Sequence, residues 1–206
     1  DMRLEKAVFY GELTHLFIPT AGVIEGVHDV QVRLAQGQLA EVTLQIPAAL
    51  TITDVQADFV SSWRFDPDQR LLRVQFSTAQ SRPFALRLRS QLATSPLPYQ
   101  QTSGVVSRVG AAGQGGMIGV ATGSGVRLDT VKEEKLSAIN LEDFSASVLA
   151  ETAKQIPGLT LRRAFRYSDA ASRIILSASA VQPEVRVETQ ETLSLGEDRT
   201  VLASQL

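Results

Sequence analysis

The stretch WRFDPDQRLLRVQF, from Trp63 to Phe76, combines the alternation and the turn chemistry of a β-hairpin. Trp63 and Phe65 alternate with polar neighbours before Asp66-Pro67-Asp68, where proline fixes a backbone angle and aspartate favours a turn. On the return arm, every second residue from Leu72 to Phe76 is apolar. Because successive side chains of a strand point to opposite faces, each arm offers one face to a core and one to water. The stretch therefore predicts two antiparallel strands of a half-buried sheet.

The same alternation recurs along the chain and predicts a series of short strands separated by turns. Val30, Val32 and Leu34 share one face of a run that ends at Gln36-Gly37, a step that predicts a hairpin with the run starting at Leu39. We therefore predict a mainly β protein, an antiparallel β-sandwich with one short helix. Further strand-like runs lie at Val8–Ile18, His28–Gln36, Leu39–Ile46, Leu50–Val60, Phe84–Leu92, Leu159–Tyr167, Arg173–Val181, Glu184–Leu193 and Thr200–Leu206.

One segment, NLEDFSASVLAETAKQIPG from Asn140 to Gly158, has the periodicity of a helix. Asn140 is a suitable N-cap, and the two acidic residues in the first turn complement the positive end of the helix dipole. Apolar residues between Phe144 and Ile156 form one stripe, and Pro157-Gly158 ends the helix. The segment predicts a short helix that lies against the sheet.

The stretch SPLPYQQTSG, from Ser95 to Gly104, interrupts the strand pattern with prolines and is the best internal boundary. It divides the chain into a β-sandwich unit, residues 1–94, and a second unit, residues 95–206, packed on the first as one compact body. FRYSDAASRIILSAS (165–179) echoes WRFDPDQRLLRVQFS (63–77). Two alternatives follow: either the halves are two related β units, or two hairpins share these letters by chance.

The stretch VGAAGQGGMIGVATGSGV, from Val109 to Val126, is rich in glycine and uncharged. A Walker-type phosphate loop ends in Gly-Lys-Ser/Thr, and this stretch contains no lysine. The dinucleotide fingerprint requires a third glycine where Ile118 stands, followed by a helix. We therefore interpret the glycines as structural, with a loop over residues 104–116 and a glycine-punctuated strand pair over Met117–Leu128.

The bulk composition, with 44% hydrophobic and 20% charged residues, is close to that of an average globular protein. A net charge of −2, from 20 basic and 22 acidic residues spread along the chain, gives little electrostatic support for nucleic-acid binding. The absence of cysteine excludes disulfides, thiolate catalysis and zinc–thiolate sites. No apolar run approaches the roughly 20 residues that span a bilayer. The abrupt start at Asp1 and the end within a strand-like run indicate a piece of a longer protein.

Few side chains are candidates for chemistry. His15 and His28 are the only histidines, and His28 stands beside an aspartate, but a metal site needs three or four converging ligands. Asp66 and Asp68 could hold calcium, although their loop lacks the fuller ligand repeat. Trp63 could stack on a sugar ring, whereas its strand parity favours core packing. We take Trp63, Asp66, Asp68 and His28 as candidate ligand-surface residues, and we predict no catalytic residue, no cofactor site and no metal site.

Three segments give the chain its family character: IPAALTITDVQADFVSSWRF (46–65), GMIGVATGSGVRL (116–128) and AFRY (164–167). They resemble uncharacterised β-rich ectodomain modules of large bacterial envelope proteins. The resemblance implies an extracytoplasmic location, periplasmic or in the cell envelope. The resemblance covers most of the chain and carries no known catalytic residue. We predict a non-catalytic structural or binding role, with neighbouring domains of the parent chain, carbohydrate or protein as partners.

The rival hypothesis is a carbohydrate-active enzyme or carbohydrate-binding domain that uses surface carboxylates and aromatics. Carboxylates gathered in a concave cleft favour the enzyme, and a flat or convex surface favours the module. A third hypothesis is β-augmentation, in which an exposed edge such as Thr200–Leu206 pairs with a neighbouring segment of the parent chain.

Overall fold

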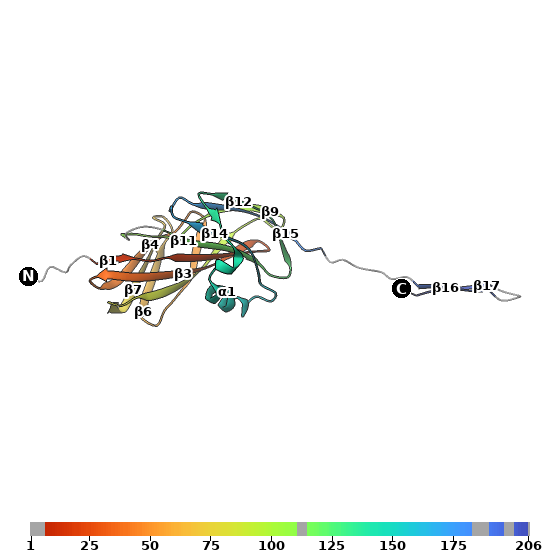
Figure 1. The fold of residues 1–206 in the computed structure, drawn as a ribbon, viewed down its shortest axis with the longest axis horizontal. Coiled ribbons are helices and arrows are strands. Elements are labelled where there is room, and N and C mark those ends of the chain that lie inside the picture. Colours follow the sequence, from red (N-terminus) through yellow and green to blue (C-terminus); the bar gives the residue numbers. More distant parts are fainter. Residues whose placement is uncertain (1–6, 111–114, 183–189, 196–199, 206) are drawn as a thin grey trace, which may run out of the picture.

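The computed structural model describes residues 7–110, 115–182, 190–195 and 200–205, and the chain is mainly β (Figure 1). Its largest sheet has eight strands in the order β13-β14-β11-β2-β3-β8-β5, with β1 paired to β3. The strands of this large sheet are β1 (Val8–Tyr10), β2 (Leu13–Thr20), β3 (Val23–Gln36), β5 (Leu50–Gln56), β8 (Phe84–Ala93), β11 (Gly116–Thr122), β13 (Ser137–Ala138) and β14 (Thr160–Tyr167).

Two smaller sheets pack against the large one. A four-stranded sheet has the order β10-β4-β7-β6, and a three-stranded sheet has the order β12-β15-β9. All three sheets contribute buried side chains to one hydrophobic cluster, which confirms the predicted mainly β, sandwich-like fold. The strands of the smaller sheets are β4 (Leu39–Gln45), β6 (Val60–Asp66), β7 (Leu71–Gln80), β9 (Tyr99–Gly104), β10 (Ser107–Arg108), β12 (Val126–Glu134) and β15 (Arg173–Ala180).

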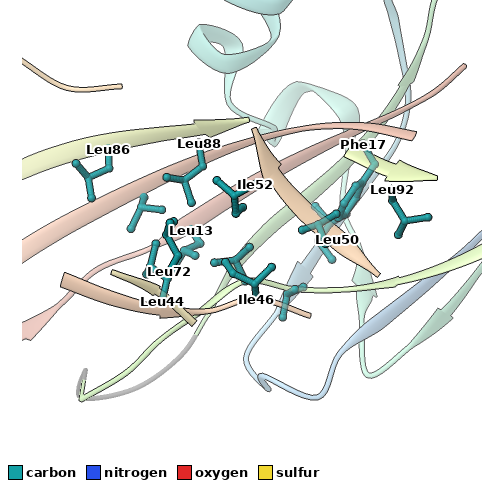
Figure 2. Close-up of a cluster of buried hydrophobic side chains, with 14 of the residues drawn as sticks. Leu13, Phe17, Leu44, Ile46, Leu50, Ile52, Leu72, Leu86, Leu88 and Leu92 are labelled. Carbon is teal, nitrogen blue, oxygen red and sulfur yellow. The ribbon is translucent and has the colours of Figure 1, made fainter. Parts of the chain in front are cut away.

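The core lies between the inner face of the large sheet and the smaller sheets (Figure 2). Leu13, Leu86 and Leu88 come from the large sheet, Leu44 and Leu72 come from the four-stranded sheet, and all five have 0% exposure. Burying one such side chain stabilises the fold by roughly 1.5–3 kcal/mol. The alternating apolar positions of the strands therefore hold the sheets face to face.

The opposite, outer face of the large sheet is covered in part by the helix α1 (Ala146–Ala153). Phe144 and Val148 pack against Leu16, Ile18 and Ala164 in a second buried cluster. Since β2 lies between this cluster and the main core, nearly all of its side chains are buried. Burial on both faces explains why Leu16, Phe17 and Ile18 of β2 are apolar in succession rather than in alternation.

The helix is shorter than the sequence predicted. Asn140 precedes a 3₁₀ turn, Leu141–Asp143, and its side chain makes no cap hydrogen bond. Phe144 is extended, and Ser145 caps α1 by accepting a hydrogen bond from the backbone N–H of Val148. A serine hydroxyl satisfies a free N–H of the first turn, so the helix begins after Ser145. The expected position against the sheet is confirmed.

Two predicted strand pairs are wrong. Gln36-Gly37 does not close a hairpin, because β3 pairs with β1, β2 and β8, whereas β4 pairs with β7 and β10. Gly37 has φ +79°, a conformation that glycine adopts without strain, and the chain leaves the large sheet there. The segments β11 and β12 are strands, but they belong to different sheets. The β6–β7 hairpin is confirmed, with Asp66 opposite Leu71.

The glycine-rich stretch is built into the large sheet. Gly116 to Thr122 form β11, which pairs in parallel with β2 and antiparallel with β14. A Cβ added at Gly116 would lie 1.8 Å from the carbonyl oxygen of Leu13, and one at Gly119 would lie 2.7 Å from the ring of Phe144. These glycines therefore permit close approach within the sheet and under the helix. Residues 111–114 lie outside the described residues.

The two halves of the chain share their sheets. β11 from the second half pairs with β2, and β10 pairs with β4, so strands from both sides of the expected boundary at residue 95 are interleaved. The segments considered as a repeat also differ, because residues 63–77 form a hairpin, whereas β14 and β15 belong to different sheets. The resemblance between these segments therefore does not extend to their structure.

The last described segments, β16 (Gln190–Leu195) and β17 (Thr200–Gln205), pair with each other in an antiparallel two-stranded sheet. The strand expected over Glu184–Leu193 lies partly outside the described residues, as does Leu206 at the end of the expected edge strand. Pairing of this edge with a neighbouring segment stays a prediction.

Candidate functional site

A chain of hydrogen bonds between polar side chains crosses the inner face of the large sheet from β14 to β8. The hydroxyl oxygen of Tyr167 lies 2.8 Å from Nε2 of His15, and Nδ1 of His15 lies 2.7 Å from Nδ1 of His28. Nε2 of His28 in turn lies 2.7 Å from Oγ of Ser90. We call these four residues the histidine chain.

The strand register brings the four side chains together. His15 on β2 lies directly opposite His28 on β3, and Gly26 on β3 lies opposite Ser90 on β8. A Cβ added at Gly26 would lie 2.2 Å from Oγ of Ser90 and 2.8 Å from Nε2 of His28. Glycine at this position therefore leaves the space in which the serine and the imidazole meet.

The histidine chain is sealed from water. Both histidines and Ser90 have 0% exposure, and Tyr167 has 5%. Burial lowers the pKa of His28 to about 3, and burial together with the neighbouring His28 lowers the pKa of His15 well below its ordinary value. Burial also raises the pKa of Tyr167, an effect opposed by the positive charge of Arg108. All four side chains are therefore neutral near pH 7.

A neutral imidazole has one N–H and one acceptor nitrogen, so the contact between the two Nδ1 atoms has one donor ring. If His28 donates there, Ser90 donates to His28 and His15 donates to Tyr167. If His15 donates instead, Tyr167 donates to His15 and His28 donates to Ser90. Either arrangement pairs all four ring nitrogens. The histidine chain thus joins four strands laterally through satisfied hydrogen bonds, each with a net contribution of about 0.5–1.5 kcal/mol.

A hollow of about 480 Å³ lies at one end of the large sheet. Arg33, Met117 and Arg166 alternate along their strands with buried core residues, so they lie on the outer face, the face that α1 covers elsewhere. We call this feature the outer hollow and define it by six of its lining side chains, Tyr10, Glu12, Gln31, Arg33, Met117 and Arg166.

The outer hollow is polar and carries an excess of positive charge. Glu12 is the acidic residue among its described lining residues, and neither Arg33 nor Arg166 forms an ion pair with a described acidic group. Tyr10 is 47% exposed on β1 and lies opposite Arg33. The hollow therefore presents an aromatic ring and two arginine side chains for contact with a ligand.

The structure does not bring the four candidate residues from the sequence into one site. His28 is fully buried in the histidine chain and is not at the surface. Trp63 is half-buried against the main core. Oδ1 of Asp66 accepts hydrogen bonds from the backbone N–H groups of Asp68 and Gln69, at 3.0 Å each, and thus shapes the β6–β7 turn. Asp68 is exposed in the same turn.

The pairing of the two histidines could have been found from the sequence. Ala21-Gly22 forms a two-residue turn, with φ +80° at Gly22, and Thr20 lies opposite Val23. Every pair in this hairpin has positions that sum to the same number, so such a turn places His15 opposite His28. The predicted strand Val8–Ile18 ended before Pro19, so the hairpin was not predicted. No sequence signal joins the residues of the outer hollow, which come from distant strands.

Within the described part of the chain, no group of three or more His, Asp or Glu side chains is arranged to hold a metal ion. In the same residues, no helix has both the length and the apolar character needed to cross a membrane.

Comparisons with known proteins give no family for the chain. No family model matches it, and no curated protein matches its sequence. Among solved structures, it is similar to a mutant M1 zinc metallopeptidase from Deinococcus radiodurans bound to a Tyr-Ser-Ala substrate, with 9% identity, a TM-score of 0.46, and coverage of 96% of this chain and 47% of that one. It is also similar to a mutant two-domain M1 zinc metallopeptidase bound to L-tryptophan, with 9% identity, a TM-score of 0.47, and coverage of 98% and 48%. The chain thus spans about half the length of these structures, and the likeness is too distant to carry an inference about function.

Proposed function

We propose that the chain is a non-catalytic structural or binding β module of a larger bacterial envelope or secreted protein. The observation that carries this proposal is the histidine chain. Both histidines, the side chains best suited to acid–base work near neutral pH, are neutral, fully buried and bonded to each other across the centre of the sheet. Their role is to hold strands together. The envelope location rests on the resemblance of the three sequence segments described above.

The outer hollow is the binding face of this module. Tyrosine and arginine are enriched at protein interfaces, because each combines a large contact area with directional hydrogen bonds. Tyr10, Arg33 and Arg166 reach the outer hollow from three different strands of a sheet that is packed on its other face. The partner is an acidic segment of a neighbouring domain, since among the described lining residues the two arginines outnumber the carboxylate of Glu12.

An NMR titration of the isotope-labelled chain with a synthetic acidic hexapeptide tests this function. We expect saturable shifts at the backbone amides of Arg33 and Met117, and loss of these shifts in Tyr10→Ala/Arg166→Gln. Arg64→Gln is the matched control, because Arg64 is exposed on β6 in a different sheet. Unchanged binding in the double variant would exclude the outer hollow as the binding face.

Carbohydrate is the second candidate ligand, favoured by the exposed ring of Tyr10 beside the polar groups of Glu12 and Gln31. The same titration with an oligosaccharide panel, followed by chromatography of the sugars, separates binding from catalysis. Binding without cleavage supports a carbohydrate-binding module. Cleavage that is lost in Glu12→Gln would establish the rival enzyme and refute the proposed function.

A further inference from the structure

A second, smaller hollow of about 260 Å³ lies where the turn between β11 and β12 meets β14. It lies away from the outer hollow and shares no described lining residue with it. We call it the arginine hollow and define it by the side chains of Arg127, Arg162 and Arg163 and the residues Gly123, Ser124 and Gly158.

An irregularity in the sheet places two adjacent arginines on the same hollow. Neighbouring residues of a regular strand point to opposite faces. In the pairing of β11 with β14, Val120 lies opposite Arg163, but the next residue, Ala121, lies opposite Leu161. Arg162 is therefore the extra residue of a β-bulge, and a bulge redirects a side chain that would otherwise face away. Both Arg162 and Arg163 consequently line the hollow.

A hydrogen bond to a buried side chain orients the guanidinium group of Arg162. Its Nε–H donates to Oγ1 of Thr122 over 3.0 Å, and Thr122 has 0% exposure. Nη1 of Arg163 donates to the backbone carbonyl of Arg162 over 2.9 Å. The described contacts of Arg162 leave both of its terminal nitrogens available to a ligand. A fixed guanidinium loses less conformational freedom on binding than a mobile one.

The positive charge of the arginine hollow is only partly compensated. Nε of Arg127 lies 2.8 Å from Oδ1 of Asp129, so the charge at the rim is paired. Neither Arg162 nor Arg163 forms an ion pair with a described acidic residue, and none of the described lining residues is acidic. Ser124, whose hydroxyl group can donate a hydrogen bond, also lines the hollow.

We propose that the arginine hollow binds an oxyanion, the phosphate or carboxylate group of a ligand. Arginine presents N–H groups in a planar fork that matches the paired oxygens of either group, and such charge-assisted hydrogen bonds are stronger than neutral ones. Arg162 and Arg163 are the residues that contact the anion. Thr122 is a positioning residue that acts through Arg162.

NMR titrations of the full chain with inorganic phosphate and with acetate, at constant ionic strength set by sodium chloride, test the site. The readouts are the backbone amides of Ser124 and Gly125 and the Nε–H of Arg162. We expect saturable shifts with phosphate. Saturation with acetate as well assigns the site to oxyanions in general, whereas saturation with phosphate alone assigns it to phosphate groups. Shifts that stay linear with both anions, as with chloride, would overturn the proposal.

Variants locate the site. Arg162→Gln and Arg163→Gln are each expected to raise the Kd for phosphate about tenfold, the effect of losing one charge-assisted contact. Arg64→Gln is the matched control and is expected to change the Kd less than about threefold, because Arg64 is exposed on β6 in a different sheet. Arg162→Lys keeps the charge but loses the fork, and Thr122→Val keeps the charge but releases Nε. Both variants are expected to weaken phosphate binding. The thermal unfolding of the control variant is expected to be unchanged. Equal effects of Arg64→Gln and Arg162→Gln would show diffuse electrostatics and refute the site.

Discussion

The histidine chain predicts a loss of stability when the pH falls from 7.5 to 5.0. In the unfolded chain, a histidine takes up a proton below its ordinary pKa of 6.5. In the folded chain, the pKa of His28 is about 3, so His28 remains neutral throughout this interval, and burial and the neighbouring His28 also lower the pKa of His15. The unfolded state therefore binds more protons, and stability rises with pH. The free energy of unfolding is therefore highest above pH 6.5, where the histidines are neutral in both states. It declines as the pH falls from 6.5 towards the folded pKa.

The magnitude follows from the distance between the pH and the ordinary pKa. One pKa unit corresponds to about 1.4 kcal/mol, so at pH 5.0 the buried neutral His28 lowers the free energy of unfolding by roughly 2 kcal/mol. The lowered pKa of His15 adds a loss in the same direction. The carboxyls whose pKa is lowered in the fold, those of Asp66, Asp129, Glu151 and Asp169, lose their stabilising effect only in more acidic solution.

Urea unfolding at pH 7.5, 6.5, 5.5 and 5.0, followed by circular dichroism, measures the effect. His28→Gln retains a hydrogen-bonding side chain but removes one titrating group, and it is expected to reduce the dependence on pH. Tyr167→Phe retains both histidines, so its free energy of unfolding is lower at every pH but has an undiminished dependence. If the free energy of unfolding of the unmodified chain is the same at pH 7.5 and 5.0, the histidines are not buried and neutral, and the reasoning fails.

Tyr167→Phe and two further substitutions, Gly26→Ala and Ser145→Ala, test the packing around these features, each by urea unfolding at pH 7.5. Tyr167→Phe is expected to lower the free energy of unfolding by about 1–3 kcal/mol, because it leaves a buried imidazole nitrogen without its partner; no change would show that water replaces the hydroxyl. Gly26→Ala is expected to destabilise by about 1–3 kcal/mol, since its Cβ would lie 2.2 Å from a buried hydroxyl oxygen. Gly125→Ala, where a Cβ meets nothing within 4 Å, is the control for that change, and equal losses would contradict the geometry. Ser145→Ala is expected to lower the free energy of unfolding by about 0.5–2 kcal/mol through loss of the helix cap, whereas Asn140→Ala is expected to be neutral. A larger loss for Asn140→Ala than for Ser145→Ala would indicate that the helix begins after Asn140.

Local patterns determined the strands themselves. The alternation from Trp63 to Phe76 predicted the β6–β7 hairpin, because a short turn brings the two strands that it connects next to each other. The missing lysine and the β-like residues after Gly116 predicted a strand instead of a phosphate loop, and β11 is that strand. These features depend on residues close in sequence, so the sequence by itself specified them.

Only the tertiary structure decided which strands became neighbours. Alternation shows that a residue faces a core, but it does not show which sheet supplies the opposite wall. For this reason Gln36-Gly37 was predicted to be a hairpin, whereas the chain crosses there from one sheet to another. The histidine chain needs β14 and β2 on either side of β11, and the outer hollow needs β1, β3, β11 and β14 at one end of the sheet. Such contacts join residues separated by up to 152 positions, and their energy comes from packing that no local pattern encodes.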